Sequence, residues 1–452
     1  STNISKIDIH YTTNNGSTWV PIILNSSASV GNFNWTVPEI PSDSCRIRIR
    51  NNQNISFVDQ SANVFSISRM KLTVPNGSQK WQLGTSKEIT FETKFVSNVR
   101  IELNRDGSNI WDPIVDSHPT TSGKYTWLLP NSQALAGANN RIRIVDADYP
   151  NVADTSEEVF TLAYLQLLTP NGGIGNQIGS SYQITWESSQ ITAVGLEYST
   201  NNGVTWKEIK NIVDASLKKY DWAIPNDASN NCIVKIYDFQ RREITDQSDS
   251  TFTISYIALT NNYGVNKSRV QVGKSYPICW NSGFVNNVSI EYSTNNGSDW
   301  NQIPEAISIP ASNAVFNWTI PNFPTRLALI RIIDVQHPQV VDTSNNLLTI
   351  STIKLISPNE LAAYQIGTTQ VISWAVENID SVLIQLSTDD GVSWQTNLSV
   401  KPALPSTFSW LLPNLRTSKA RIRITDKNDL SIEDASDTSF VIGTFPRLTV
   451  NR

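Results

Sequence analysis

The chain has 452 residues, which is too long for a single hydrophobic core, so we expect several domains. Its 35 basic and 40 acidic side chains leave a net charge of −5, which excludes the basic surface that nucleic acids require. Charged residues are only 17% of the chain, and no apolar run approaches the roughly 20 residues that span a bilayer. We therefore expect a secreted protein with no nucleic-acid partner and no membrane-spanning segment.

Three short signatures recur in the same order along the chain and define a repeat of about 94 residues. The first is an Asn-Gly or Asp-Gly hairpin that leads into tryptophan, as in EYSTNNGVTW, and its glycine returns every 91 to 96 residues, at Gly16, Gly107, Gly203, Gly297 and Gly391. The second is an aromatic strand that ends at proline, as in FNWTIP, and the third is an alternating strand such as RIRITD. Five copies of this unit account for the chain.

The repeat predicts an all-β fold, because its segments alternate apolar and polar residues with period two and are bounded by turn residues. About seven short strands in each copy are typical of an antiparallel β-sandwich of the immunoglobulin (Ig) or fibronectin III (FnIII) type. We therefore expect a tandem array of five such modules, the first one incomplete. The expected ranges are 1–69 (module 1, incomplete), 70–164 (module 2), 165–257 (module 3), 258–352 (module 4) and 353–444 (module 5), followed by an orphan strand at 445–452 for a following module or subunit.

The residues inside each repeat predict local contacts. Glycine in the hairpin supplies the positive φ angle that a tight turn needs. In the segment 421–424 isoleucines alternate with arginines, so we expect the isoleucines in the core and the arginines toward solvent. A carboxylate recurs on the strand before the hairpin, at Glu102, Glu197 and Glu291, and we expect each to form a cross-strand ion pair with the neighbouring basic strand.

With these signatures the chain resembles the tandem Ig-like and FnIII-like repeats of large bacterial secreted or cell-surface proteins. The resemblance rests on EYSTNNGxTW, WTIPN and RIRIxD and extends over the whole chain. A related module occurs in the anchored wall proteins of fungi. The resemblance implies an extracellular structural or adhesive array and transfers no active-site residue.

Motifs that would indicate an enzyme or a metal site are weak. Residues 387–394 fit the Asp-box of sialidase-like propellers, but propeller blades repeat every 40 to 50 residues or so, far below the spacing found here. The stretch 102–107 resembles the start of a calcium loop, yet Pro113 stands where the bidentate glutamate belongs. His118 and His337 lie in different modules, and we expect both to be solvated. We expect no catalytic, cofactor-binding or metal-binding residue and no cofactor.

The three cysteines fall in different modules, at Cys45, Cys232 and Cys279. A disulfide between any two of them would have to connect separate sandwiches. We therefore expect three buried thiols that react slowly.

The two ends of the chain do not match its middle. Alignment on the hairpin glycines leaves module 1 without its first two strands, whereas Leu448, Thr449 and Val450 repeat the opening strand 71–75 of module 2. Two explanations stay open. Either the chain is a window of a longer tandem array, or the orphan strand completes module 1 of the next subunit and builds a head-to-tail polymer, in which a second strand would still be missing.

We expect a non-enzymatic structural protein, a subunit or segment of an extracellular filament or cell-surface stalk. Its partners would be copies of itself or further modules of a longer chain. The alternative is an extracellular adhesin or an array of glycan-binding modules, with surface glycans as the partner. Module 2 is then the candidate ligand surface, because Trp81 is an additional aromatic outside the repeat pattern and His118 lies in the long loop 117–123.

Overall fold

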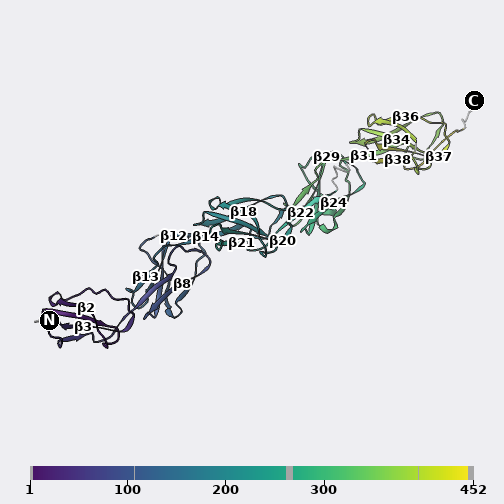
Figure 1. Cartoon of the computed structure of the whole chain (residues 1–452). Coiled ribbons are helices and arrows are strands. Elements are labelled where there is room, and N and C mark those ends of the chain that lie inside the picture. The colour runs from purple at the N-terminus through teal and green to yellow at the C-terminus, as the bar shows by residue number, and fades with distance from the viewer. Residues whose placement is uncertain (1–3, 106, 261–267, 395, 446–452) are drawn as a thin grey trace, which may run out of the picture.

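The structure, a computed structural model, describes residues 4–105, 107–260, 268–394 and 396–445. These residues form β-sandwiches arranged end to end in an elongated rod, with module 1 at one end and module 5 at the other (Figure 1). The predicted fold class, an all-β tandem array of Ig- and FnIII-like sandwiches, is confirmed. Modules 1 to 5 are the ranges given above, and the exact boundaries of these ranges remain predictions.

Module 3 shows the complete sandwich. One sheet contains the second half of β14, then β16 and β19, and the other has the order β18, β17, β20 and β22, with the short β15 parallel to β22 and β21 beside β20. Trp186, Trp222 and Ile236 are buried in the core between the two sheets. The elements are β14 (Phe160–Thr169), β15 (Gly175–Gln177), β16 (Ser181–Ser189), β17 (Ala193–Ser199), β18 (Lys207–Asp214), the 3-10 helix η4 (Ala215–Leu217), β19 (Lys219–Ala223), β20 (Ser229–Asp238), β21 (Thr245–Gln247) and β22 (Phe252–Leu259).

Modules 2, 4 and 5 repeat this arrangement, each around its own hydrophobic core. Module 2 contains β6 (Arg69–Val74), β7 (Lys80–Gln82), β8 (Ser86–Lys94), β9 (Asn98–Asn104), β10 (Asp112–Pro119), η2 (Thr120–Ser122), β11 (Lys124–Leu128), η3 (Gln133–Leu135), β12 (Gly137–Asp146) and β13 (Ala153–Thr155). Module 4 contains β23 (Arg269–Gln271), β24 (Ser275–Gly283), β25 (Asn287–Ser293), β26 (Asn301–Gln302), η5 (Pro304–Ala306), β27 (Ile309–Pro310), η6 (Ala311–Asn313), β28 (Val315–Thr319), β29 (Thr325–Asp334), β30 (Val341–Thr343) and β31 (Leu348–Ser357). Module 5 contains β32 (Ala363–Gln365), β33 (Thr369–Glu377), β34 (Ser381–Ser387), β35 (Thr396–Pro402), β36 (Thr407–Leu411), β37 (Thr417–Asp426), β38 (Asp429–Ala435) and β39 (Phe440–Gly443).

Module 1 is smaller, and its single sheet has the order β2, β1, β3 and β4, with β5 also paired to β3. Its elements are β1 (Lys6–Thr12), β2 (Val20–Ser27), η1 (Ala28–Val30), β3 (Ser42–Asn51), β4 (Val58–Gln60) and β5 (Phe65–Ile67). The segment FNWTVP at 33–38 was expected to be a strand, and the structure corrects this, because 31–41 is irregular. The counterpart β19 of module 3 is paired to β16, and the described part of module 1 holds no counterpart of β16.

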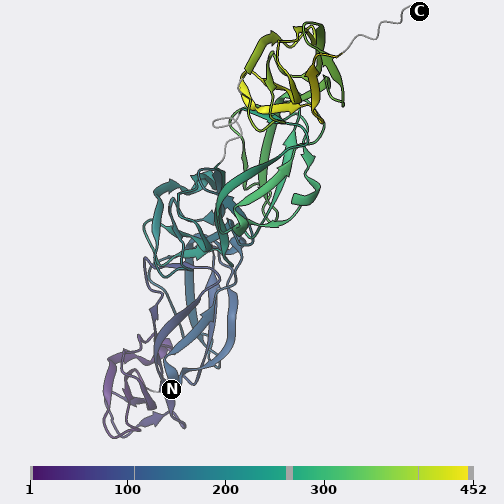
Figure 2. The ribbon, with the colours of Figure 1, turned by 90° about the vertical axis from the view of Figure 1, so that its right-hand side faces the viewer.

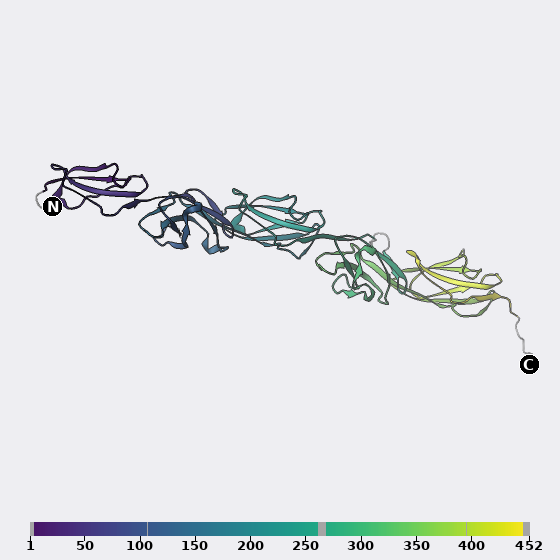
Figure 3. The same cartoon turned by 90° about the horizontal axis from the view of Figure 1, so that it is seen from below.

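Modules 2 to 5 share strands at their junctions instead of being joined by linkers, whereas β5 and β6 at the junction of modules 1 and 2 are separate strands. The first half of β14 pairs with β12 and β7 of module 2, and its second half pairs with β16 of module 3. β22 and β31 cross the next two junctions in the same way. A strand cannot bend freely while both of its halves are hydrogen-bonded, so these junctions are stiff. The other views show the same extended rod, in which modules 1, 3 and 5 present a similar face and modules 2 and 4 a different one (Figures 2 and 3).

The expected contacts inside the repeat are present. The hairpin glycines have φ between 67° and 94°, and Ile422 and Ile424 are fully buried. The three predicted ion pairs form between directly opposed residues: Glu102 with Arg143, Glu197 with Lys235, and Glu291 with Arg331, at 2.5 to 2.6 Å. Each of these cations also lies over the ring of the tryptophan after the hairpin, 4.1 to 4.3 Å from its centroid. The outer face of the sheet therefore carries a repeated layer of carboxylate, cation and indole.

Candidate functional site

The most distinctive feature of the rod is an open groove in module 1. A complete module covers its core with a first strand, a short parallel strand and a second strand, which in module 3 are the second half of β14, β15 and β16. The described residues of module 1 contain none of these three strands. The inner face of β1 and β3 is therefore left uncovered.

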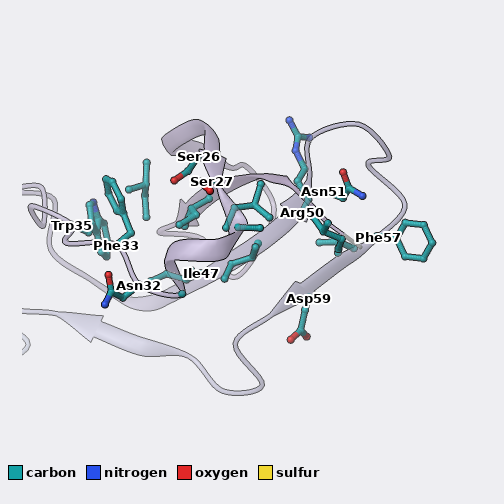
Figure 4. A pocket seen from close by; sticks show the side chains of 18 residues that line it. Ser26, Ser27, Asn32, Phe33, Trp35, Ile47, Arg50, Asn51, Phe57 and Asp59 are labelled. Carbon is teal, nitrogen blue, oxygen red and sulfur yellow. The ribbon is translucent and has the colours of Figure 1, made fainter. Parts of the chain in front are cut away.

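The groove has a volume of about 660 Å³ and an apolar lining. Its apolar side chains include Ile7 and Ile9 of β1, Ile22 of β2, Phe33 and Trp35, Ile47 and Ile49 of β3, and Phe57 and Val58. Figure 4 shows Phe33 and Trp35 at one end of the groove and Phe57 at the other. Ile49 is 44% exposed, whereas Ile236, which holds the same place in module 3, is completely buried. Such an exposed apolar surface is typical of an interaction site.

Part of the module 1 core is nevertheless arranged as in a complete module. The rings of Tyr11 and Trp35 lie 5.1 Å apart, and the corresponding rings of Tyr198 and Trp222 in module 3 lie 5.2 Å apart. At the end of the groove where Trp35 lies, the wall therefore keeps the side-chain arrangement of a complete module.

Module 1 also departs from the repeat on its outer face, where His10 stands opposite Arg48 in the place of the glutamate–cation pair. His10 is only 5% exposed. Its pKa is lowered by burial and by the nearby charges of Arg50 and Arg48. Nδ1 of His10 and Nε of Arg48 have no hydrogen-bond partner among the described residues. Module 1 therefore lacks the carboxylate that stabilises the layer in modules 2 to 4.

A second repeated site lies at the junctions between modules. The side-chain amide of Gln82 in module 2 donates to the carbonyl of Thr245 in module 3 at 2.8 Å and accepts from its N–H at 2.9 Å. Gln177 binds Val341 in the same way, and Gln271 binds Glu433. We call this pair of hydrogen bonds a glutamine bridge. Each bridge connects the short parallel strand of one module to an edge strand of the next and restricts bending.

An ionic or packing contact stands beside each glutamine bridge. Nζ of Lys80 lies 2.6 Å from the buried carboxylate of Asp238, and NH1 of Arg269 lies 3.1 Å from that of Asp426. At the junction between modules 3 and 4 the ring of His337 packs against Gly175, and its Nδ1 lies 3.0 Å from Asp334. The expectation that His337 is solvated is therefore corrected, because the preceding module covers part of its ring.

Sequence reasoning did not find the junction glutamines, although a signal for them exists. Each stands two residues before the glycine that opens the second strand, in the pattern Gln-x-Gly, at Gln82, Gln177, Gln271 and Gln365. The period was visible, but a glutamine in a polar chain has no distinctive chemistry until its partner more than 160 residues away is known.

The residues predicted for a ligand surface do not lie together. Trp81 is 7% exposed, because β7 runs parallel to β14 and turns the indole into the core against Phe160. Its expected position on the surface is therefore corrected. His118 is half-buried on β10, where its ring contacts Tyr125 edge-on and its Nε2 lies 3.0 Å from the carbonyl of Lys124.

The expected loop 117–123 is instead the end of β10 followed by η2, and a polar pocket of about 390 Å³ opens beside η2. It is lined by Arg69, Glu92, Lys94 and the residues 120–123, among others. Trp81 is not part of it.

Leu448, Thr449 and Val450, which were predicted to mediate self-assembly, lie outside the described residues. Cys45 and Cys232 are buried, whereas Cys279 on β24 is half-buried. Within the described ranges, no cluster of three or more His, Cys, Asp or Glu side chains is placed to hold a metal ion. In the same ranges, no helix is long and apolar enough to cross a membrane.

The segment that fits the Asp-box is a hairpin turn that other modules share. Oγ of Ser387 donates to Asp389 at 2.6 Å and accepts from the N–H of Gly391 at 2.8 Å. In module 4, Ser293, Asn295 and Gly297 form the same hydrogen bonds. The motif therefore stabilises a turn here.

Comparison with known proteins gives only distant structural likenesses. No protein-family model matches it, and no curated protein matches it. The five Ig domains of Sidekick-1 align over 97% of this chain and 93% of their own, with 10% identity and a TM-score of 0.19. The I-band fragment I67–I69 of titin aligns over 63% of this chain and 98% of its own, with 8% identity and a TM-score of 0.23. The FnIII-like modules of Clostridium thermocellum CbhA align over 41% of this chain and 93% of their own, with 14% identity and a TM-score of 0.17. These likenesses concern the fold alone.

Proposed function

We propose that this chain is a non-enzymatic structural protein, a stiff segment of an extracellular filament or cell-surface stalk. The observation that carries the proposal is the construction of the junctions. β14, β22 and β31 each run through a junction as one strand, and a glutamine bridge fixes each junction a second time. An array built for recognition alone does not need this stiffness, whereas a spacer or filament subunit does.

The proposal includes head-to-tail assembly, in which the groove of module 1 receives a strand from another copy. An uncovered apolar sheet face is unfavourable, and an added strand would cover part of it, although the second strand of the module would still be missing. The segment 448–450 repeats the sequence of the strand that covers the core of module 2, with leucine and valine at the alternate positions. A head-to-tail contact of this kind continues as an open polymer instead of closing.

Small-angle scattering and negative-stain microscopy test the two parts of the proposal. The dissolved chain should scatter as a rod with little bending, and a broad distribution of bent shapes would contradict it. Concentrated material should form filaments with one chain per axial repeat, and a chain that lacks 447–452 should not. Filaments that survive this deletion would exclude strand complementation but leave the rod intact. A native intact mass well above 50.3 kDa would instead identify the chain as part of a longer array.

A second candidate function is adhesion to surface glycans through module 2. The supporting observation is the polar pocket beside η2, the 3-10 helix that follows the strand of His118. A glycan array should then show binding that is lost in Lys94→Ala, whose side chain lines the pocket. Trp81→Phe serves as the control, because that ring lies in the core. Equal binding by both variants would argue against a glycan site here.

A further inference from the structure

Every complete module holds its first strand by the same hydrogen bond. A carboxylate on the short edge strand accepts from a leucine N–H of the first strand, at 2.7 Å in each case. The pairs are Asp154 with Leu72, Asp246 with Leu167, Asp342 with Leu259, and Asp434 with Leu355. Four independent copies make this contact a property of the module.

In two modules a serine adds a second contact three residues further along the same strand. Oγ of Ser248 donates to the carbonyl of Pro170 at 2.7 Å, and Oγ of Ser436 donates to the carbonyl of Pro358 at 2.8 Å. The serine lies two residues after the carboxylate, directly beyond the end of the edge strand. Together they hold the first strand at two points, three residues apart, and so determine its register.

The described part of module 1 keeps both of these groups and contains no first strand. Asp59 on β4 is exposed and lines the groove (Figure 4), and among the described residues its carboxylate accepts only from the N–H of Gln60. Ser61 follows two residues later and accepts from the N–H of Ile47 at 3.2 Å, as Ser248 does from Val234. The acceptor and the donor for an incoming strand are therefore already in place.

We propose that Asp59 and Ser61 set the register of the docked strand, with Asp59 accepting from the N–H of Leu448 and Ser61 donating to the carbonyl of Asn451 of a second copy. This inference rests on the proposed head-to-tail assembly. The spacing fits, because Leu448 and Asn451 are three residues apart, as are Leu167 and Pro170. In this register the Leu448 side chain enters the groove, as Leu72 enters the core of module 2 with 1% exposure.

The register matters because a strand that slips by one residue turns all its side chains to the other face. A slipped strand would direct Arg447 and Thr449 into the apolar groove. Two effects disfavour this slipped arrangement. It loses the hydrogen bond to the carboxylate, and it buries the unpaired guanidinium of Arg447, which is costly.

Peptide binding to the full chain, measured at concentrations where it is monomeric, tests the inference. The probe is the octapeptide FPRLTVNR, which corresponds to residues 445–452. Methylation of the Leu448 nitrogen removes the proposed donor, and methylation of the Thr449 nitrogen is the matched control. We expect the first change to weaken binding about tenfold or more, since the lost hydrogen bond is to a charged acceptor, and the second to have little effect.

Variants of the chain give the reciprocal measurement. Asp59→Ala should weaken binding of the unmodified peptide by a similar factor and should no longer distinguish the two methylated peptides. Asp43→Ala removes an exposed carboxylate from the same module and should bind like the parent chain. Since Asp59 is exposed, its replacement is not expected to unfold module 1.

The outcomes separate the two proposals. If the octapeptide binds but neither Leu448 methylation nor Asp59→Ala weakens it, the register inference is wrong and strand docking stands. If the octapeptide does not bind and the chain forms no filaments, the proposed assembly itself is wrong. If native material carries residues before Ser1 that fill the groove, a second copy is excluded as the source of the strand.

Discussion

Gln177 and Val341 bind each other through two hydrogen bonds across the junction between modules 3 and 4, although they are 164 residues apart in the chain. The bridge is the side-chain equivalent of one step of an antiparallel ladder. Since β22 already crosses this junction as a continuous strand, the bridge supplies a second point of attachment, and a body held at two points cannot pivot about either.

Removal of one glutamine bridge should loosen one junction without unfolding either module. Gln177→Ala loses two hydrogen bonds, which should lower the free energy of docking between modules 3 and 4 by about 1 to 3 kcal/mol. Small-angle scattering should then show a shorter mean end-to-end length. Gln240→Ala, an exposed glutamine in module 3, is the control and should scatter like the parent chain. Identical profiles for both variants would show that the shared strand alone fixes the junction.

The cation that covers the hairpin tryptophan should be replaceable by another cation but not by a neutral side chain. Arg331 lies over Trp300 and pairs with Glu291, both partly exposed to solvent, so we expect Arg331→Ala to destabilise module 4 by only about 1 to 2 kcal/mol. Arg331→Lys should cost less, because Lys235 fills the same place in module 3. Urea unfolding followed by tryptophan fluorescence measures both. Equal losses would mean that the planar guanidinium is required.

The hairpin of module 5 should keep its full stability down to about pH 4 and lose it progressively as the pH falls through about 2. Hydrogen bonds from Ser387 and Ser393 lower the pKa of Asp389 to about 2 from its ordinary value of 3.8. Because the pKa is lower in the folded state, the stabilisation is fully present above about pH 4 and is lost as the pH falls through 2. A carbon-detected NMR titration of the carboxyl group measures this directly.

Asp389→Asn is the matched control for this titration. Asn295 holds the same place in module 4 and makes the corresponding bonds to Ser293 and to the N–H of Asp299. The variant should therefore keep the hairpin and lose its acid dependence. A turn in the variant that opens at neutral pH would show that the charge itself is needed.

The sequence was sufficient for features that depend on neighbours along the chain or on one adjacent strand. Period-two alternation placed Ile422 and Ile424 in the core, and the recurrence of Glu291 opposite a basic strand predicted its ion pair with Arg331. Each of these features needs only local periodicity and the pairing order of a sandwich.

Features that depend on residues far apart in the chain could not be predicted in the same way. The burial of Trp81 depends on which way β7 faces when it pairs with β14, some 80 residues later, and the partial burial of His337 depends on the preceding module. The irregular path of 31–41 depends on a missing partner strand, since the same sequence pattern forms a strand wherever that partner is present. In all three cases the observed structure is determined by tertiary contacts and not by local propensity.

The buried thiols should differ in reactivity according to their surroundings. Burial raises the pKa of Cys232 to about 11, so little thiolate is present at pH 8 and its reaction with a disulfide reagent should be slow. Cys279 is half-buried and should react before Cys45 and Cys232. Timed labelling followed by peptide mass spectrometry gives the order. Rapid labelling of Cys232 in the folded chain would show that module 3 opens often.

Gly175 should be required for tight docking of module 4 on module 3. A Cβ atom at this position would lie 2.3 Å from Cγ of His337, although the backbone there has no positive φ that would itself exclude alanine. Gly175→Ala should therefore leave module 3 folded and push the modules apart, at a cost of about 1 to 3 kcal/mol in docking. Shortening the opposing side chain in Gly175→Ala/His337→Ala should restore the scattering profile of a straight rod, because it removes the clash. A double variant that bends as much as the single one would show that steric exclusion is not the reason for glycine at this junction.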